Sequence, residues 1–115
     1  MHHPDRYAAA ASLAGYYTAI VDRSTGDLYR GHTGATRWNS PQWEVAHKLT
    51  TVALYLVASR GDPQAMWAMA RMRRAVDDRS PLVTVTLPVG GHNFHVWYTA
   101  TPAAFEWLGA HLPAP

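Results

Sequence analysis

The stretch 40–60 shows the clearest helical pattern in the sequence, and it constrains the fold more than any other segment. Ser40 followed by Pro41 is typical of a helix start, because serine caps the first amides and proline at the first helical position loses no hydrogen bond. Apolar residues then recur every three or four positions, as on one helix face. They are Val45, Leu49, Val52 and Leu56. The pattern predicts one long helix that ends before Gly61 and packs on a sheet.

Length and composition indicate a single globular domain over residues 1–115. Hydrophobic residues make up 48% of the chain and charged residues 16%, which is typical of a chain with a buried core. There is no cysteine, so no disulfide is possible and a cytoplasmic location is expected. No signal peptide or membrane span is predicted, because the apolar runs are too short. Abundant alanine, and arginine in place of lysine, indicate a GC-rich bacterial gene.

Turn residues and periodicity predict the remaining elements. Further helices are expected at 5–14, 63–77 and 101–112, and strands at 16–21, 28–32, 82–87 and 92–99. The predicted fold class is α+β: two β-hairpins form a mainly antiparallel four-stranded sheet, packed by a central αα-hairpin and a C-terminal helix.

The last predicted strand, 92–99, carries aromatic side chains on both faces. Alternation places His95 and Trp97 on one face and Phe94, Val96 and Tyr98 on the other. Such a strand is either covered on both sides or exposes an aromatic patch. The leading functional hypothesis is therefore a non-enzymatic domain that binds a protein partner, or a second copy of itself, through this aromatic sheet face.

Glu44 and His47 are the main candidates for chemistry. They lie three residues apart on the predicted central helix and so share a face. With nearby histidines they would supply a site of two histidines and one carboxylate. Such pairs are common by chance, and His92 and His95 would point to opposite faces of a strand, so no metal or cofactor is expected. A small-molecule or metal-binding domain, possibly enzymatic, is the second hypothesis.

His32 lies between Gly31 and Gly34, in a loop whose amides can approach an anion. No helix follows directly and no Walker lysine is present, so the segment is not a phosphate-binding loop of the nucleotide-hydrolase kind. We interpret it as an irregular loop, with His32 as a candidate binding residue.

Three arginines cluster on the predicted second helix, at Arg71, Arg73 and Arg74. Spacing of four residues predicts ion pairs of Arg73 with Asp77 and of Arg74 with Asp78. The formal net charge of the chain is only +2, so nucleic-acid binding through this helix is the third hypothesis.

Several catalytic signatures are missing from the sequence. It contains no G-x-S-x-G nucleophile motif, no paired-cysteine zinc motif and no kinase signature. The cysteines that zinc deaminases require are also absent. Asp62 is interpreted as a helix cap, which leaves Glu44 and a histidine for acid–base chemistry.

Overall fold

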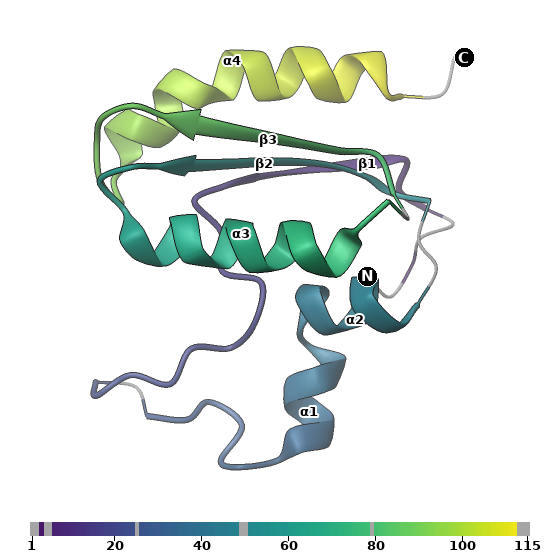
Figure 1. Cartoon of the computed structure of the whole chain (residues 1–115), viewed down its shortest axis with the longest axis vertical. Coiled ribbons are helices and arrows are strands. Elements are labelled where there is room, and N and C mark those ends of the chain that lie inside the picture. The colour runs from purple at the N-terminus through teal and green to yellow at the C-terminus, as the bar shows by residue number, and fades with distance from the viewer. Residues whose placement is uncertain (1–2, 4–5, 25, 49–50, 79, 113–115) are drawn as a thin grey trace.

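A parallel three-stranded sheet lies at the centre of the fold (Figure 1). The structure, a computed structural model, describes residues 3, 6–24, 26–48, 51–78 and 80–112. Strand β1 spans Ala9–Leu13, β2 spans Ala53–Ser59 and β3 spans Leu82–Leu87. Their order in the sheet is β1-β2-β3, and both neighbouring pairs are parallel. All three carboxyl ends therefore point to the same edge of the sheet.

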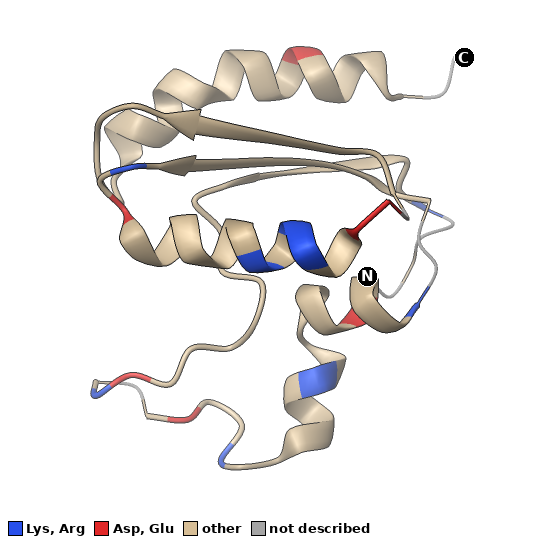
Figure 2. Cartoon of the chain, in the orientation of Figure 1, with Lys and Arg blue, Asp and Glu red and all other residues tan. Residues whose placement is uncertain are grey.

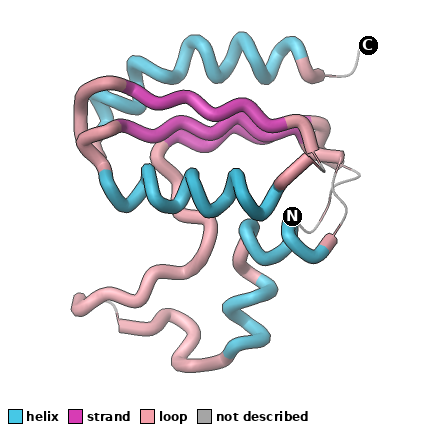
Figure 3. Tube along the Cα trace, in the orientation of Figure 1, coloured by secondary structure: helices cyan, strands magenta, loops and turns pink. Residues whose placement is uncertain are grey.

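Helices cover both faces of this sheet and give the molecule three layers (Figures 1 and 3). On one side lie α1 (Thr33–Trp38), α2 (Pro41–His47) and α3 (Pro63–Val76), and on the other lies α4 (Phe94–Ala110). None of the helices in the described part of the chain is long and apolar enough to cross a bilayer.

Strand β2 is buried at all seven of its positions. Leu54 and Leu56 pack in the cluster that contains α3, whereas Tyr55 and Val57 pack in the cluster that contains α4. A parallel strand covered on both faces needs apolar side chains on both, so its sequence lacks the alternation of a half-exposed strand.

Helix α3 matches the prediction from sequence. The Asp62 carboxylate caps it by accepting a hydrogen bond from the amide of Ala65 at 3.0 Å, and Pro63 is the first helical residue. One stripe of small and flexible apolar residues is buried, namely Ala65, Ala68, Met69, Met72 and Val76. The helix ends where Asp77 takes a positive φ of 51°.

The predicted antiparallel four-stranded sheet is wrong, because the sheet has three parallel strands. The central error lies in the stretch 40–60. Ser40 and Pro41 do start a helix, but α2 ends at His47 and Lys48 is already extended. The apolar run that follows is β2, not the second half of the helix. Spacing alone does not separate a buried strand from a buried helix. Asp5 and Leu49, which belonged to predicted helices, lie outside the described residues.

The predicted hairpins are wrong as well. Residues Ala9–Leu13 form β1 where a helix was expected. The described residues of 14–24 and 26–32 form no strand, although an isolated bridge joins Asp22 and Gly26. No strand forms at 92–99: residues 94–99 are the start of α4, and the side chain of Asn93 caps this helix by accepting a bond from the amide of Val96 at 3.1 Å. The predicted helix at 101–112 corresponds to the second half of α4, which ends at Ala110.

The connection after β1 is pinned to the helical layer at Tyr17. Its backbone carbonyl accepts hydrogen bonds from the Ser40 hydroxyl and from the amide of Gln42, each at 3.0 Å. Its ring is 6% exposed and belongs to the α3-side core. Burial raises the pKa of the Tyr17 phenol above its ordinary value, and the Ser12 side chain partly offsets this.

Tyr17 should therefore make the fold sensitive to alkali. The pKa of Tyr17 is higher in the folded protein than in the unfolded chain. Its contribution to the free energy of unfolding is therefore complete below the unfolded pKa of about 10 and is lost as pH rises through the folded pKa. We expect Tyr17→Phe to leave the free energy of unfolding near its original value at pH 7 and to flatten its fall above about pH 10. Urea titrations across this pH range measure the free energy of unfolding at each pH. Tyr29→Phe is the control, and equal alkaline loss in all three proteins would contradict the assignment.

Candidate functional site

The candidate functional site lies at the edge of the sheet where the carboxyl ends of the strands meet. In open sheets of parallel strands, ligands bind in the crevice outside this edge. The loops after β2 and β3 lead here directly into α3 and α4, so both helices begin at this edge (Figure 1). The loop after β2 carries Asp62 and the loop after β3 carries His92.

Asp62 and His92 form a hydrogen-bonded pair. Nδ1 of His92 lies 2.6 Å from Oδ2 of Asp62. The Asp62 side chain is 5% exposed, whereas that of His92 is 41% exposed. A carboxylate can only accept, so Nδ1 carries the proton and the neutral ring keeps a lone pair on Nε2. The second oxygen of Asp62 caps α3, which fixes the carboxylate to a rigid element.

Aromatic rings hold the imidazole on two sides. Tyr16 stacks on His92 with ring centres 5.5 Å apart, and Trp97 meets it edge-on at 5.0 Å. The Tyr16 hydroxyl donates to Gln64 at 3.3 Å. Burial, and then the negative charge of Asp62, raise the pKa of Tyr16, so it is a neutral phenol at physiological pH. The ring of His92 is therefore oriented by packing as well as by its carboxylate.

Backbone contacts clamp the two loops together. The Ser59 hydroxyl donates to the carbonyl of Gly90 at 2.6 Å and accepts from the amide of Gly61 at 3.2 Å. Gly90 has a φ of 111°, in the region that glycine tolerates. A Cβ on Gly61 would collide with the backbone of Gly90. This close approach sets the spacing between Asp62 and His92.

An apolar hollow of about 490 Å³ lies at the start of α4. Phe94, His95, Trp97, Tyr98 and Thr101 line it. Trp97 contacts both Phe94, at a ring separation of 4.8 Å, and His92. Trp97 therefore lines the hollow and also contacts the imidazole of His92.

This pair can act as a general base. No hydrogen bond within the described residues occupies Nε2 of His92, so the lone pair can accept a proton from a bound hydroxyl or water. The buried carboxylate then stabilises the imidazolium that forms.

Three of the candidate binding residues from sequence come together on α4. His95, Trp97 and Tyr98 all line the apolar hollow, but on a helix rather than on a sheet face. Tyr98 is 81% exposed, while Trp97 is half-buried against the core. His32 stands apart, at the start of α1, where its carbonyl accepts a bond from Thr36.

Within the part of the chain that the structure describes, Glu44 and His47 do not join a third ligand-type side chain in one cluster. Glu44 is 2% exposed and bonds the ammonium of Lys48 at 2.8 Å. His47 stacks on Trp43, and its Nδ1 donates to the Trp43 carbonyl at 2.7 Å. Within the described residues, no three His, Asp or Glu side chains come together as a metal site.

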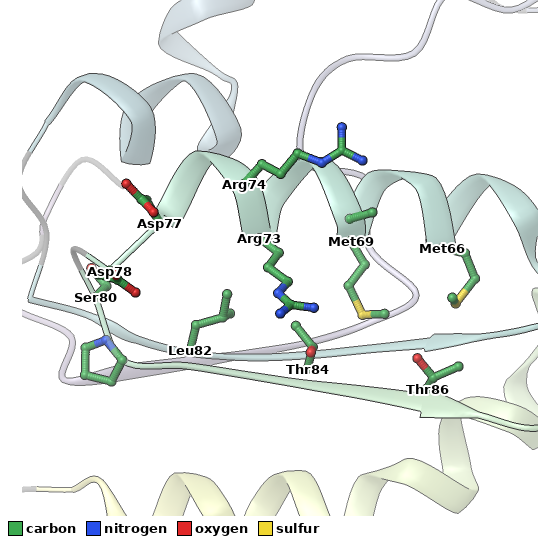
Figure 4. A pocket seen from close by; sticks show the side chains of 12 residues that line it. Met66, Met69, Arg73, Arg74, Asp77, Asp78, Ser80, Leu82, Thr84 and Thr86 are labelled. Atoms are coloured by element: carbon green, nitrogen blue, oxygen red, sulfur yellow. The ribbon is translucent and has the colours of Figure 1, made fainter.

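The arginines of α3 separate to different surfaces. Arg71 stacks over Trp67, with its guanidinium 4.6 Å from the ring centre. Arg73 extends into a groove of about 1000 Å³ between α3 and β3, which also contains Asp77 and Asp78 (Figure 4). The predicted pair of Arg73 with Asp77 is not formed, because α3 ends at Val76 and Asp77 leaves the helical path. Arg74 and Asp78 are not paired either; both line this groove.

The pairing of Asp62 with His92 was not predicted from the sequence. A signal was present: Asp62 follows the apolar run 53–59 and His92 follows the predicted strand 82–87, each after a short turn that contains glycine. Since the first run was interpreted as helix, the two residues were not assigned to the same edge of one sheet.

Comparisons with protein-family models, with curated proteins and with solved structures find no match to this chain.

The clamp at Gly61 gives a stability test. We expect Gly61→Ala to lower the free energy of unfolding by about 2 kcal/mol or more, because the collision is with backbone and no side chain can yield. Gly109→Ala is the matched control, since Gly109 lies in α4 with open space around it, and alanine there should stabilise by up to about 1 kcal/mol. Urea unfolding measures both. Equal stability of the two variants would contradict the close approach.

Proposed function

We propose that the protein hydrolyses esters or related acyl compounds, with His92 as general base and Asp62 as the residue that orients it. The observation that carries the proposal is the 2.6 Å bond between His92 and a carboxylate that is 5% exposed. A cytoplasmic location accompanies this proposal, from the lack of cysteine.

In the proposed reaction the nucleophile is an oxygen that carries a proton. Nε2 of His92 takes that proton as the oxygen attacks the acyl carbon, and the imidazolium then returns it to the leaving oxygen. Asp62 stays ionised throughout and supplies only orientation and charge. The chain has no G-x-S-x-G motif, so water is the nucleophile for the isolated chain, and a hydroxyl from a partner protein would use the same base.

The arrangement supports this reaction by analogy. Serine hydrolases built on parallel sheets also carry a carboxylate and then a histidine, in that chain order, beyond the carboxyl ends of strands. Here Asp62 follows β2 and His92 follows β3. The analogy concerns arrangement and roles, and the site residues carry the argument.

Asp62→Asn separates the catalytic role of Asp62 from its role as a cap. Asparagine caps helices as well as aspartate does, so the fold should persist. Its amide would donate toward Nδ1 of His92, move the ring proton to Nε2 and abolish the base. We expect hydrolysis of 4-nitrophenyl acetate to fall by about 10²-fold or more in Asp62→Asn and in His92→Gln.

His111→Gln is the matched control, because His111 is the C-cap residue at the opposite end of α4 from His92. This variant should retain activity. Nitrogen-15 NMR of His92 should report protonated Nδ1 in the original protein and protonated Nε2 in Asp62→Asn. If His92→Gln and His111→Gln hydrolyse the ester equally well, the proposal is wrong.

Self-association through α4 is the second candidate function. Phe94, Tyr98 and Phe105 are 83%, 81% and 68% exposed, and their spacing of four and seven residues places them on one helix face. Glu106 is the only charged residue of α4 apart from a histidine (Figure 2). A second copy fits this face, because an uncharged aromatic stripe meets no like charge about a two-fold axis. Nucleic acid is less favoured, since Arg71 and Arg73 lie on different surfaces.

A charge on this stripe should block the association. We expect the original protein to form dimers in sedimentation experiments and Tyr98→Glu to be monomeric, because a carboxylate would have to be desolvated at the contact. Leu28→Glu is the control, as Leu28 is 71% exposed but lies in the loop between β1 and α1. A monomeric original protein at every concentration would exclude this candidate.

A further inference from the structure

A second hollow lies between α1, α2 and α3, and we propose that it binds the phosphate group of a small free ligand, either inorganic phosphate or a phosphomonoester. Its volume is about 220 Å³. The residues that matter are Thr36 and Arg37 from α1, Gln42 and His47 from α2, and Arg71 from α3. None of them belongs to the His92–Asp62 pair.

The charge around this hollow has one sign. Arg37 and Arg71 are always cationic, His47 can be protonated, and no acidic residue lines the hollow. Glu44 lies on the same helix as His47, but it is buried and bonded to Lys48. Because the chain carries eight acidic residues against ten basic ones, a hollow with two arginines and no carboxylate indicates an anionic ligand.

Arg71 is held in place before any ligand binds. Its guanidinium stacks on Trp67. With the Gln42 amide oriented so that its oxygen faces the guanidinium, that oxygen accepts from Nε at 3.3 Å and from Nη2 at 3.2 Å. A guanidinium has five N–H donors, so three remain for a ligand. A pre-positioned fork of donors matches the oxygens of a phosphate group.

His47 adds a group that suits a phosphate in either ionisation state. Its Nδ1 donates to the Trp43 carbonyl at 2.7 Å, and its ring is stacked on Trp43 with centres 4.4 Å apart. Nε2 is therefore the atom available to a ligand. It accepts from the hydroxyl of a phosphate monoanion or, once protonated, donates to a dianion.

The size of the hollow limits the ligand. Pockets for drug-sized molecules begin at about 300 Å³, so 220 Å³ admits a phosphate and a short ester group but not a whole nucleotide. Thr36 also lines the hollow. Its hydroxyl donates to the carbonyl of His32 at 3.2 Å, so it can accept a hydrogen bond from a ligand but not readily donate one.

Calorimetric titration at low ionic strength tests the site, with inorganic phosphate, glycerol phosphate and succinate as probes. We expect both phosphates to bind and succinate to bind more weakly. A preference for glycerol phosphate would identify a phosphomonoester as the ligand, and a preference for inorganic phosphate would identify the free ion. Arg71→Ala should weaken phosphate binding by about tenfold or more, because it removes the charge-assisted fork.

Variants of the arginines distinguish phosphate binding at this hollow from effects on folding or on the net charge of the protein. Arg37→Ala should weaken binding several-fold, and it removes a side chain that makes no hydrogen bond within the described residues. Arg71→Lys should bind less tightly than the original protein, because it keeps charge but loses the fork. Arg74→Ala, on the same helix but lining the other groove, should leave affinity unchanged. Absent binding, or equal loss in Arg74→Ala and Arg71→Ala, would overturn the proposal.

Discussion

Burial of β2 on both faces is the constraint on which the rest of the structure depends. Its seven residues are buried, and residues 54–58 pack in the two apolar clusters on either side of the sheet. Its two neighbours run parallel to it. Between parallel strands, each connection must return along a face of the sheet to the edge where the next strand begins. The carboxyl ends of all three strands therefore lie at one edge. Asp62 and His92 meet there because they follow adjacent strands, although 30 residues separate them along the chain.

Asp62 serves both the fold and the candidate chemistry. A carboxylate that is 5% exposed is costly to bury unless both of its oxygens are satisfied. The amide of Ala65 satisfies one, and the imidazole of His92 satisfies the other. One carboxylate therefore both starts α3 and orients His92. A residue that the sequence identifies only as a helix cap is also the partner of the proposed general base.

Sequence reasoning succeeded where local signals were sufficient. The Asp62-Pro63 start and the stripe that ends at Val76 identify α3, and the strand at 82–87 is observed as predicted. It failed where tertiary packing decided the outcome. The run 53–59 is compatible with a helix in isolation and becomes a strand because both of its faces are covered. Asn93 starts a helix in a segment rich in strand-forming residues. The pairing of Asp62 with His92 was not predicted because these two elements were misassigned. The structure places three of the candidate binding residues together on α4, namely His95, Trp97 and Tyr98, and their role in binding stays a prediction.

Helix α3 links the two proposed sites mechanically. Asp62 caps its first turn and Arg71 lies nine residues further on, about 14 Å along the axis at a rise of 1.5 Å per residue. The buried stripe from Ala65 to Val76 packs against the sheet, so α3 cannot slide without disrupting the core. The same packing therefore orients the carboxylate behind His92 and the guanidinium above Trp67. Each site is pre-organised by contacts that stabilise the fold, and a ligand in one would influence the other only by displacing this helix.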